Sequence, residues 1–119
     1  MIFSVGVDIA SIKRLKKSVY NNAFLDRLLT DNERQYVFTK RHSYRHIAGR
    51  FAAKEAVMKA LGTGWSKEIG WRDIEIINTP SGRPIVKLYS NAGVITLGKK
   101  VFLSLAYAKD IALAFAIVE

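Results

Sequence analysis

The chain has 119 residues, no cysteine, and 19 Lys and Arg against 10 Asp and Glu, which gives a net charge of +9. This length predicts a single domain over residues 1–119, and the lack of cysteine excludes disulfides and thiolate metal sites and favours a cytoplasmic protein. The longest apolar run, 111–118, is too short to cross a membrane, and the start of the chain lacks the pattern of a signal peptide.

Positive charge is concentrated in the first half of the chain. Between Lys13 and Arg50 the only acidic residues are Asp26, Asp31 and Glu33. We therefore expect an anionic partner. Nucleic acid, a phosphate-bearing small molecule and an acidic protein all fit this charge.

The first predicted elements are a strand and two short helices. Apolar and β-branched residues favour a strand over Ile2–Ile9, with Asp8 near its end. A short helix is expected over Asn21–Leu29. The sequence TDNE at Thr30–Glu33 has the form of a capping box and predicts another helix that ends near Phe38. A carboxylate at the end of an apolar strand is unusual, which makes Asp8 a candidate functional residue.

A long helix is predicted from Ser43 to Leu61, where Gly62 supplies a typical C-terminal cap. Its second half reads RFAAKEAVMKAL, in which eight of twelve residues are apolar. At about 100° per residue these positions cover most of the helix circumference, so we expect the helix to be largely enclosed.

Four charged residues interrupt this apolar helix in two narrow sectors. Arg50 and Lys54 share one sector, and Glu55 and Lys59 share the other. The simplest interpretation is a surface ion pair between Glu55 and Lys59, worth about 0.2–0.5 kcal/mol. The alternative is that the charged groups receive a ligand, and this helix alone does not decide between the two.

The second half of the chain predicts two β-hairpins separated by a short helix over 91–97. The turn sequence PSGRP joins the first pair of strands and AKD joins the second. The expected strands are 73–79, 85–90, 100–107 and 111–118. One strand, several helices and then four strands predict an α+β fold, with an antiparallel sheet packed on the long helix.

The two histidines do not favour a zinc site. His42 and His46 lie one helical turn apart, but Arg41 and Arg45 beside them oppose the binding of a cation. We expect solvated or phosphate-facing imidazoles instead.

Oxygen ligands remain possible for a metal ion. Asp8 and Glu55 are candidates for Mg²⁺, which commonly takes one or two carboxylates and completes its shell with water and substrate phosphates. Neither a phosphate-binding Gly-rich loop nor a nucleophile elbow is present in the sequence.

Taken together, five motifs resemble the holo-acyl-carrier-protein synthases, the small class of 4′-phosphopantetheinyl transferases. The resemblance covers essentially the whole chain. The motifs are GVDIASIKRL (6–15), RFAAKEAVMKALGTG (50–64), WRDIEI (71–76), SGRP (81–84) and ALAFAIVE (112–119).

The resemblance implies an activity and a metal. The 4′-phosphopantetheine arm of coenzyme A is transferred to a serine of apo acyl carrier protein, for fatty acid biosynthesis, and adenosine 3′,5′-bisphosphate is released. Asp8 and Glu55 would hold Mg²⁺ against the diphosphate, and Lys59 would offset charge on the leaving group. Glu55 would also accept the serine proton, directly or through a water on the metal.

The resemblance also implies binding surfaces and an assembly. Lys13, Arg14 and Lys17 would lie on a basic helix that docks the acidic helix of acyl carrier protein. A homotrimer with active sites between subunits is implied, and the strand 111–118, apolar at every position, agrees with it because both of its faces should be covered. The residues implied in coenzyme A binding are Arg50, Lys54, Lys59, Arg41, Arg45, Gly82 and Pro84.

Two positions depart from the family pattern. Ala106 and Tyr107 stand where many members have Ser-His, so a role of that histidine in holding the nucleotide does not carry over. Ser11 stands where Glu is common.

Two other functions are compatible with part of the sequence. A basic nucleic-acid-binding module would use the charge of +9 with Tyr36, Phe38 and Tyr44, but no recognised nucleic-acid-binding signature is present. A carrier-protein-binding subunit without catalysis would not need Asp8, Glu55 and Lys59.

Overall fold

The computed structural model describes residues 1–19, 21–62 and 69–119. Three strands form an antiparallel sheet in the order β1-β5-β4, and β2 and β3 form a separate two-stranded sheet. The elements are β1 (Ser4–Ser11), α1 (Ile12–Val19), α2 (Asn22–Leu28), α3 (Asp31–Phe38), α4 (Ser43–Leu61), the 3-10 helix η1 (Trp71–Asp73), β2 (Ile74–Asn78), β3 (Pro84–Leu88), α5 (Ser90–Ile95), β4 (Val101–Ala108) and β5 (Ile111–Val118).

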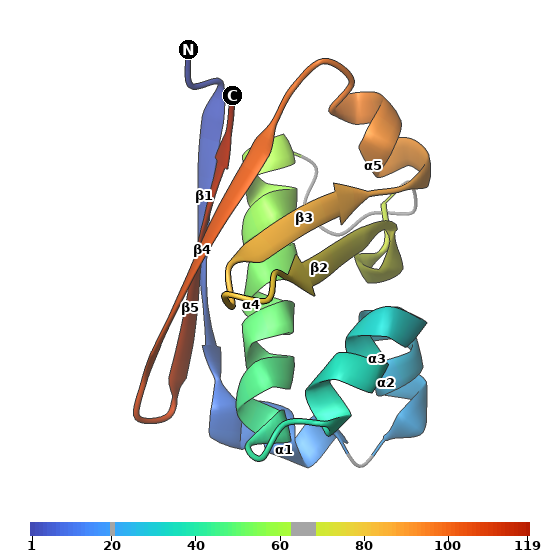
Figure 1. Cartoon of the computed structure of the whole chain (residues 1–119), viewed down its shortest axis with the longest axis vertical. Coiled ribbons are helices and arrows are strands. Elements are labelled where there is room, and N and C mark those ends of the chain that lie inside the picture. Colours follow the sequence, from blue (N-terminus) through green and yellow to red (C-terminus); the bar gives the residue numbers. More distant parts are fainter. Residues whose placement is uncertain (20, 63–68) are drawn as a thin grey trace.

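The predicted α+β class and both hairpins are confirmed, but the strands form two sheets where one was expected. The apolar strand β5 lies in the middle of the larger sheet and pairs with β1 on one side and β4 on the other. Strand β2 pairs only with β3 among the described strands. In Figure 1, α4 runs alongside the larger sheet, and the β2–β3 hairpin crosses in front of α4.

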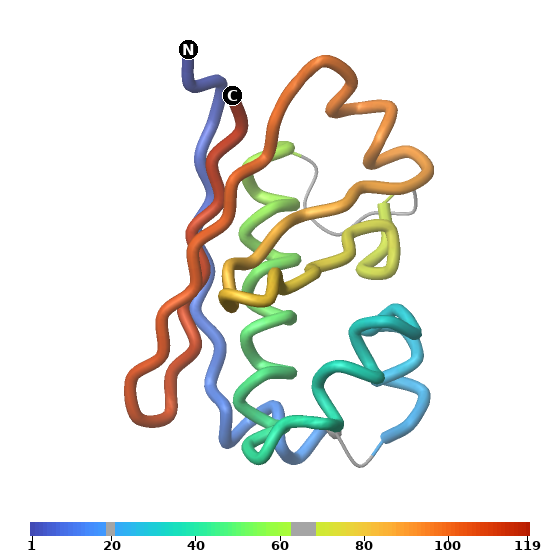
Figure 2. The backbone as a smooth tube through the Cα atoms, viewed as in Figure 1, coloured from blue at the N-terminus to red at the C-terminus, as the bar shows by residue number. Residues whose placement is uncertain are grey.

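The first strand begins and ends two residues later than predicted. The first strand spans Ser4–Ser11 and not Ile2–Ile9, because its pairing with β5 runs from Ser4 opposite Val118 to Ser11 opposite Ile111. This pairing places the two termini at the same end of the sheet (Figure 2). Helix α1 follows at once, as the resemblance implied.

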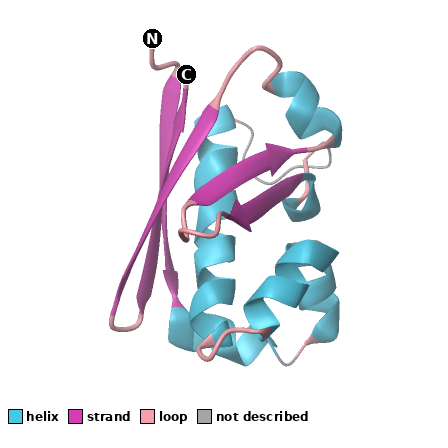
Figure 3. Cartoon of the chain, in the orientation of Figure 1, coloured by secondary structure: helices cyan, strands magenta, loops and turns pink. Residues whose placement is uncertain are grey.

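Local capping signals formed as predicted. Thr30 and Glu33 make both hydrogen bonds of a capping box, with the Thr30 hydroxyl accepting from the Glu33 amide and the Glu33 carboxylate accepting from the Thr30 amide. Gly62 caps α4 with a φ of 78°. Figure 3 shows α2 and α3 beside the N-terminal half of α4.

Small residues bring α4 very close to one face of the larger sheet. Gly6 of β1 is the tightest point, since a Cβ atom there would lie 2.1 Å from the Ala56 carbonyl oxygen. This close approach fixes the position of β1 relative to α4. The alanines buried in the core cluster that includes this interface are Ala10, Ala48, Ala52, Ala53, Ala56, Ala60, Ala92, Ala112, Ala114 and Ala116.

The opposite face of the larger sheet is apolar and exposed. The exposed fractions are 48% for Val7, 60% for Ile9, 38% for Phe115 and 43% for Phe102. These side chains share a face because strand residues alternate and the registers place β1, β5 and β4 side by side. Within the described residues, no helix is long and apolar enough to span a membrane.

Candidate functional site

Asp8 and Lys59 are joined across the interface between β1 and α4. The Lys59 ammonium donates to Asp8 Oδ1 at 2.9 Å and to the Val7 carbonyl oxygen at 3.0 Å. The Asp8 side chain is 16% exposed and that of Lys59 is 53% exposed. The ion pair therefore lies at the edge of the β1–α4 interface, where Lys59 remains accessible to a ligand.

Glu55 lies one helical turn before Lys59 on α4 and is partly buried. Its Oε1 accepts a hydrogen bond from Trp71 Nε1 at 3.3 Å. The surface ion pair between Glu55 and Lys59 is not formed in the described part of the chain, since Lys59 turns to Asp8. Trp71 stands in the motif WRDIEI, but its contact with Glu55 was not expected from the sequence.

The carboxylates of Asp8 and Glu55 suit Mg²⁺ better than a metal ion that needs three or more protein ligands. Asp8 and Glu55 supply carboxylates from facing elements, and the described residues contain no group of three or more His, Cys, Asp or Glu that could hold a metal ion. Mg²⁺ needs only one or two protein carboxylates when phosphate oxygens and water complete its shell. Asp8 and Glu55 therefore fit an ion that arrives with a diphosphate substrate.

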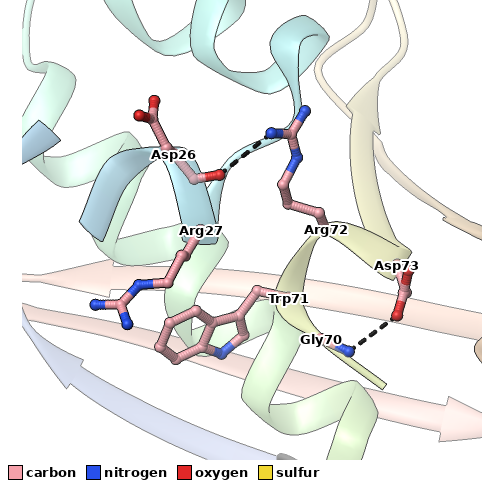
Figure 4. A pocket seen from close by; sticks show the side chains of 6 residues that line it. All are labelled: Asp26, Arg27, Gly70, Trp71, Arg72 and Asp73. Atoms are coloured by element: carbon pink, nitrogen blue, oxygen red, sulfur yellow. Dashed lines mark hydrogen bonds between the residues drawn. The ribbon is translucent and has the colours of Figure 1, made fainter. Parts of the chain in front are cut away.

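A cavity of about 510 Å³ lies beside Trp71, the residue that contacts Glu55. Asp26 and Arg27 of α2 form one side, and Gly70 to Asp73 form the other (Figure 4). The Arg72 guanidinium donates to the Asp26 carbonyl oxygen at 3.3 Å and so links the two sides.

Lys54 does not fit the expected contact with coenzyme A. Its ammonium is fully buried and donates to the Leu28 carbonyl oxygen and to Glu33 Oε1, each at 2.5 Å. Burial lowers the pKa of Lys54, and the nearby Glu33 carboxylate opposes this shift. Lys54 therefore joins α4 to α2 and α3 from inside the protein, out of reach of a ligand.

Arg50 is also buried, but one of its donors is unused. The side chain is held at Nη2 by the Asn78 amide oxygen at 2.6 Å and by the Ile76 carbonyl oxygen at 3.2 Å. Its guanidinium lies 4.5 Å from the centre of the Tyr36 ring. Nε is buried without a hydrogen-bond partner among the described residues. Burial lowers the pKa of Arg50.

Arg50 reaches a cavity of about 410 Å³ in which three predicted contacts meet. Gly82 and Pro84 of the SGRP turn line it together with Arg50, and all three are residues that the resemblance implies in coenzyme A binding. His46 and Tyr107 form another part of its wall. Burial raises the pKa of Tyr107. His46 was expected from the sequence to be solvated or phosphate-facing, and Tyr107 stands where many family members have histidine; the structure brings both to this cavity wall.

Arg41 and Arg45 line an adjoining basic cavity of about 440 Å³. The Arg45 guanidinium lies 4.6 Å from the centre of the Tyr107 ring, so Tyr107 connects the two cavities. The basic cavity also includes Lys16 and Lys109. Its charge is suited to an anion.

The predicted carrier-binding residues lie together on α1. Lys13, Arg14 and Lys17 are exposed, and the helix is anchored by its backbone, since the Lys13 amide donates to Asp110 Oδ1 at 2.7 Å. Asp110 has a lowered pKa because of hydrogen bonds from Ser11 and Lys13. The end of the long motif, Thr63 and Gly64, lies outside the described residues.

Known proteins resemble this chain over nearly its whole length. Residues 4–116 match the model of the 4′-phosphopantetheinyl transferase superfamily. The holo-[acyl-carrier-protein] synthase of Protochlamydia amoebophila is 40% identical, over 98% of both chains. A crystal structure of a Bacillus anthracis holo-(acyl-carrier-protein) synthase in complex with CoA (3′,5′-ADP) has a TM-score of 0.87 and 36% identity, and the match covers 100% of this chain and 97% of that one. The crystal structure of the Helicobacter pylori holo-[acyl-carrier-protein] synthase in complex with coenzyme A has a TM-score of 0.86 and 32% identity. That match covers 97% of this chain and 99% of the other.

Proposed function

Because the chain belongs to the 4′-phosphopantetheinyl transferase superfamily, and within it to the holo-acyl-carrier-protein synthases, we propose that residues 1–119 act as one enzyme domain. The enzyme transfers the 4′-phosphopantetheine group of coenzyme A to a serine of apo acyl carrier protein. The products are holo acyl carrier protein, for fatty acid biosynthesis, and adenosine 3′,5′-bisphosphate. As the cysteine-free sequence suggests, we place the reaction in the cytoplasm.

The observation that carries this proposal is the pairing of Asp8 with Lys59, with Glu55 one turn away on the same helix. Two carboxylates and an accessible ammonium then face the point where a diphosphate would be cleaved. The alternative function as a nucleic-acid module gives no reason for two carboxylates at this position.

The chemistry follows from these residues. The serine hydroxyl oxygen attacks the phosphorus that carries the pantetheine group, and the bond from that phosphorus to the bridging oxygen of the diphosphate breaks. The serine proton passes to Glu55, directly or through a water. Lys59 offsets the negative charge that develops on the bridging oxygen, which leaves with adenosine 3′,5′-bisphosphate.

Asp8 and Glu55 would hold Mg²⁺, and the bound ion would supply electrostatic stabilisation of the diphosphate and of the leaving group. The role of this chain is to fix the two carboxylates. Lys59 positions Asp8, and the indole of Trp71 positions Glu55.

The nucleotide end of coenzyme A would bind in the cavity of Arg50, Gly82 and Pro84. The buried Arg50 Nε, which lacks a partner among the described residues, supports a phosphate contact there. Arg41 and Arg45 extend the positive field into the adjoining cavity. Arg50 is pre-oriented by Asn78, which lowers the entropy that a phosphate contact would cost.

Acyl carrier protein would dock on α1, where Lys13, Arg14 and Lys17 present positive charge to solvent. Complementary charge of this kind speeds association and orients the partner.

A homotrimer would cover the exposed apolar face of the larger sheet. Val7, Ile9, Phe115 and Phe102 are exposed there on neighbouring strands. An apolar face of this kind is typical of a surface that another protein covers. In the trimer, the strand near Tyr107 or the SGRP turn of one subunit would complete the site of Asp8 and Glu55 in the next.

The direct test incubates the full chain with apo acyl carrier protein, coenzyme A and Mg²⁺ and follows the carrier by mass spectrometry. We expect the carrier to gain the mass of one phosphopantetheine arm, and adenosine 3′,5′-bisphosphate to appear in equal amount. Reactions with a chelator, and with a carrier whose acceptor serine is replaced by alanine, are the controls. A carrier that stays in the apo form with the wild-type chain contradicts the proposed function.

A further inference from the structure

His46 lies in the wall of the cavity that Arg50 reaches. It extends from α4 and is neither fully exposed nor fully buried. Its ring meets Tyr36 edge-on, with the centroids 6.0 Å apart, and lies 6.5 Å from the Tyr107 ring. Aromatic contacts on two sides therefore fix the imidazole, whereas its nitrogen atoms have no hydrogen-bond partner among the described residues.

Positive groups lie near His46 on α4 and in the segment between α3 and α4. On its own helix the cations are Arg45 and Arg50, Lys40 follows α3, and His42 precedes α4. The groups contributed by α3 and β4 are the phenols Tyr36 and Tyr107. Burial lowers the pKa of His46, and these cations lower it further. The imidazole of the free protein is therefore largely uncharged at neutral pH.

The residues that line this cavity favour an anion. Its described lining includes Arg50, Arg83 and His46 and no acidic residue. A phosphate in this cavity would reverse the electrostatic environment of His46, because a nearby negative charge favours the imidazolium form.

We propose that His46 is a proton-linked contact for the anionic end of the nucleotide, uncharged in the free protein and protonated when a phosphate of coenzyme A occupies this cavity. The proposal rests on the proposed function, of which it names one binding residue. The bound imidazolium donates a charge-assisted hydrogen bond to the phosphate. After transfer, release of the bisphosphate returns the proton to solvent.

The sign of the pH effect follows from this linkage. His46 has a higher pKa with the phosphate bound than without it, so the added affinity is complete below the pKa of the free protein and is lost as the pH rises through the pKa of the complex. A shift of one pKa unit would change the affinity by about tenfold. The 3′-phosphate itself has a pKa of about 6, and it gains negative charge as the pH rises through that value, which strengthens binding. The affinity should therefore be measured above about pH 6, where this charge no longer changes.

The first test is an NMR titration of the two histidine rings in the wild-type protein. The chain has only His42 and His46, so a single variant, His42→Asn, assigns both signals. We expect saturating adenosine 3′,5′-bisphosphate to raise the pKa of His46 by about one unit or more, and that of His42 by less. His42 serves as the matched control because it lies in the neighbouring basic cavity.

The second test uses the variant His46→Phe, which keeps a ring against Tyr36 and Tyr107 but cannot take up a proton. For the wild type we expect the KM for coenzyme A to rise about threefold to tenfold between pH 6.5 and pH 8. For the variant we expect the KM for coenzyme A to change by less than about twofold over the same pH range, because the phenyl ring cannot take up a proton. A merely structural role of His46 would lower activity without changing the pH profile of KM.

The two tests distinguish failure of the inference about His46 from failure of the proposed function. If the bisphosphate binds and the pKa of His46 stays unchanged, or if His42 shows the larger rise, the inference is overturned while the proposed function stands. If the bisphosphate does not bind to the wild-type protein at all, the proposed function fails together with the inference. The NMR test uses unaltered protein, so it decides the question even if His46→Phe does not fold.

Discussion

Lys54 and Glu33 form a fully buried ion pair, in which Nζ and Oε1 lie 2.5 Å apart and both side chains are completely shielded from solvent. Glu33 also accepts hydrogen bonds from the backbone amides of Thr30 and Ile76. This one carboxylate thus connects α3, α4 and β2, and Lys54 balances its charge inside the protein.

The first prediction concerns this ion pair. Lys54→Met should lower the free energy of unfolding by about 3–5 kcal/mol, because it leaves the Glu33 carboxylate buried without its cation. Urea unfolding measures the loss. Lys59→Met on the same helix is the matched control and should cost no more than about 1 kcal/mol, since its ion pair with Asp8 is largely exposed on the lysine side.

The same variant separates stability from binding. Folded Lys54→Met should keep the wild-type KM for coenzyme A, because its ammonium cannot reach a ligand. A KM raised tenfold in folded protein would restore Lys54 as a coenzyme A contact.

The second prediction concerns the two carboxylates. Asp8→Asn and Glu55→Gln should each lower kcat at least about a hundredfold, since each removes a charge that would hold the metal. Circular dichroism and thermal unfolding should show an intact fold. Asp31→Asn, at a carboxylate that is 99% exposed, is the matched control and should leave kcat unchanged. Near wild-type rates in Asp8→Asn or Glu55→Gln would contradict the metal assignment.

The third prediction concerns the basic helix α1. Arg14→Glu should raise the KM for acyl carrier protein much more than that for coenzyme A, because it reverses charge on the carrier surface alone. Added salt should weaken the same step in the wild type. Lys100→Glu makes an equivalent change at the opposite end of the larger sheet, and steady-state kinetics should show little effect. Equal effects of Arg14→Glu on both substrates would show that α1 is not a separate carrier surface.

The fourth prediction concerns the contact between β1 and α4. Gly6→Ala should destabilise the protein by about 1–3 kcal/mol, because its Cβ would lie 2.1 Å from the Ala56 carbonyl oxygen and force the two elements apart. Gly70→Ala is the control, since the nearest atom to its Cβ would be 4.0 Å away. Thermal unfolding of both variants compares them directly. Equal stabilities would mean that β1 moves away from α4 at no cost.

The fifth prediction concerns assembly through the exposed face of the larger sheet. Phe115→Lys should convert the proposed trimer to monomers and abolish transfer, because a lysine there would place charge in an apolar interface. Val94→Lys, at a side chain that is 72% exposed on α5, is the matched control and should leave the trimer intact. Sedimentation and activity across a dilution series measure both properties. A wild-type monomer with full specific activity at nanomolar concentration would refute the trimer and the shared site.

The sequence by itself determined the features that depend on near neighbours. The capping box at Thr30, the end of α4 at Gly62 and both hairpin turns could be predicted because each rests on contacts within a few residues. The largely enclosed character of α4 followed from its apolar positions in the same way. The resemblance in five motifs then supplied the family.

Only the tertiary structure decided which partner each charged group takes. Lys54 and Lys59 are both lysines on one enclosed helix, yet Lys54 binds Glu33 in the core while Lys59 binds Asp8 at an edge. The difference depends on which elements pack against each side of α4, and spacing along one helix carries no information about that. The two sheets, the hydrogen bond from Trp71 to Glu55 and the place of His46 in the cavity wall likewise depend on contacts between residues far apart in the chain. Such contacts form only when the apolar faces of several elements are buried together.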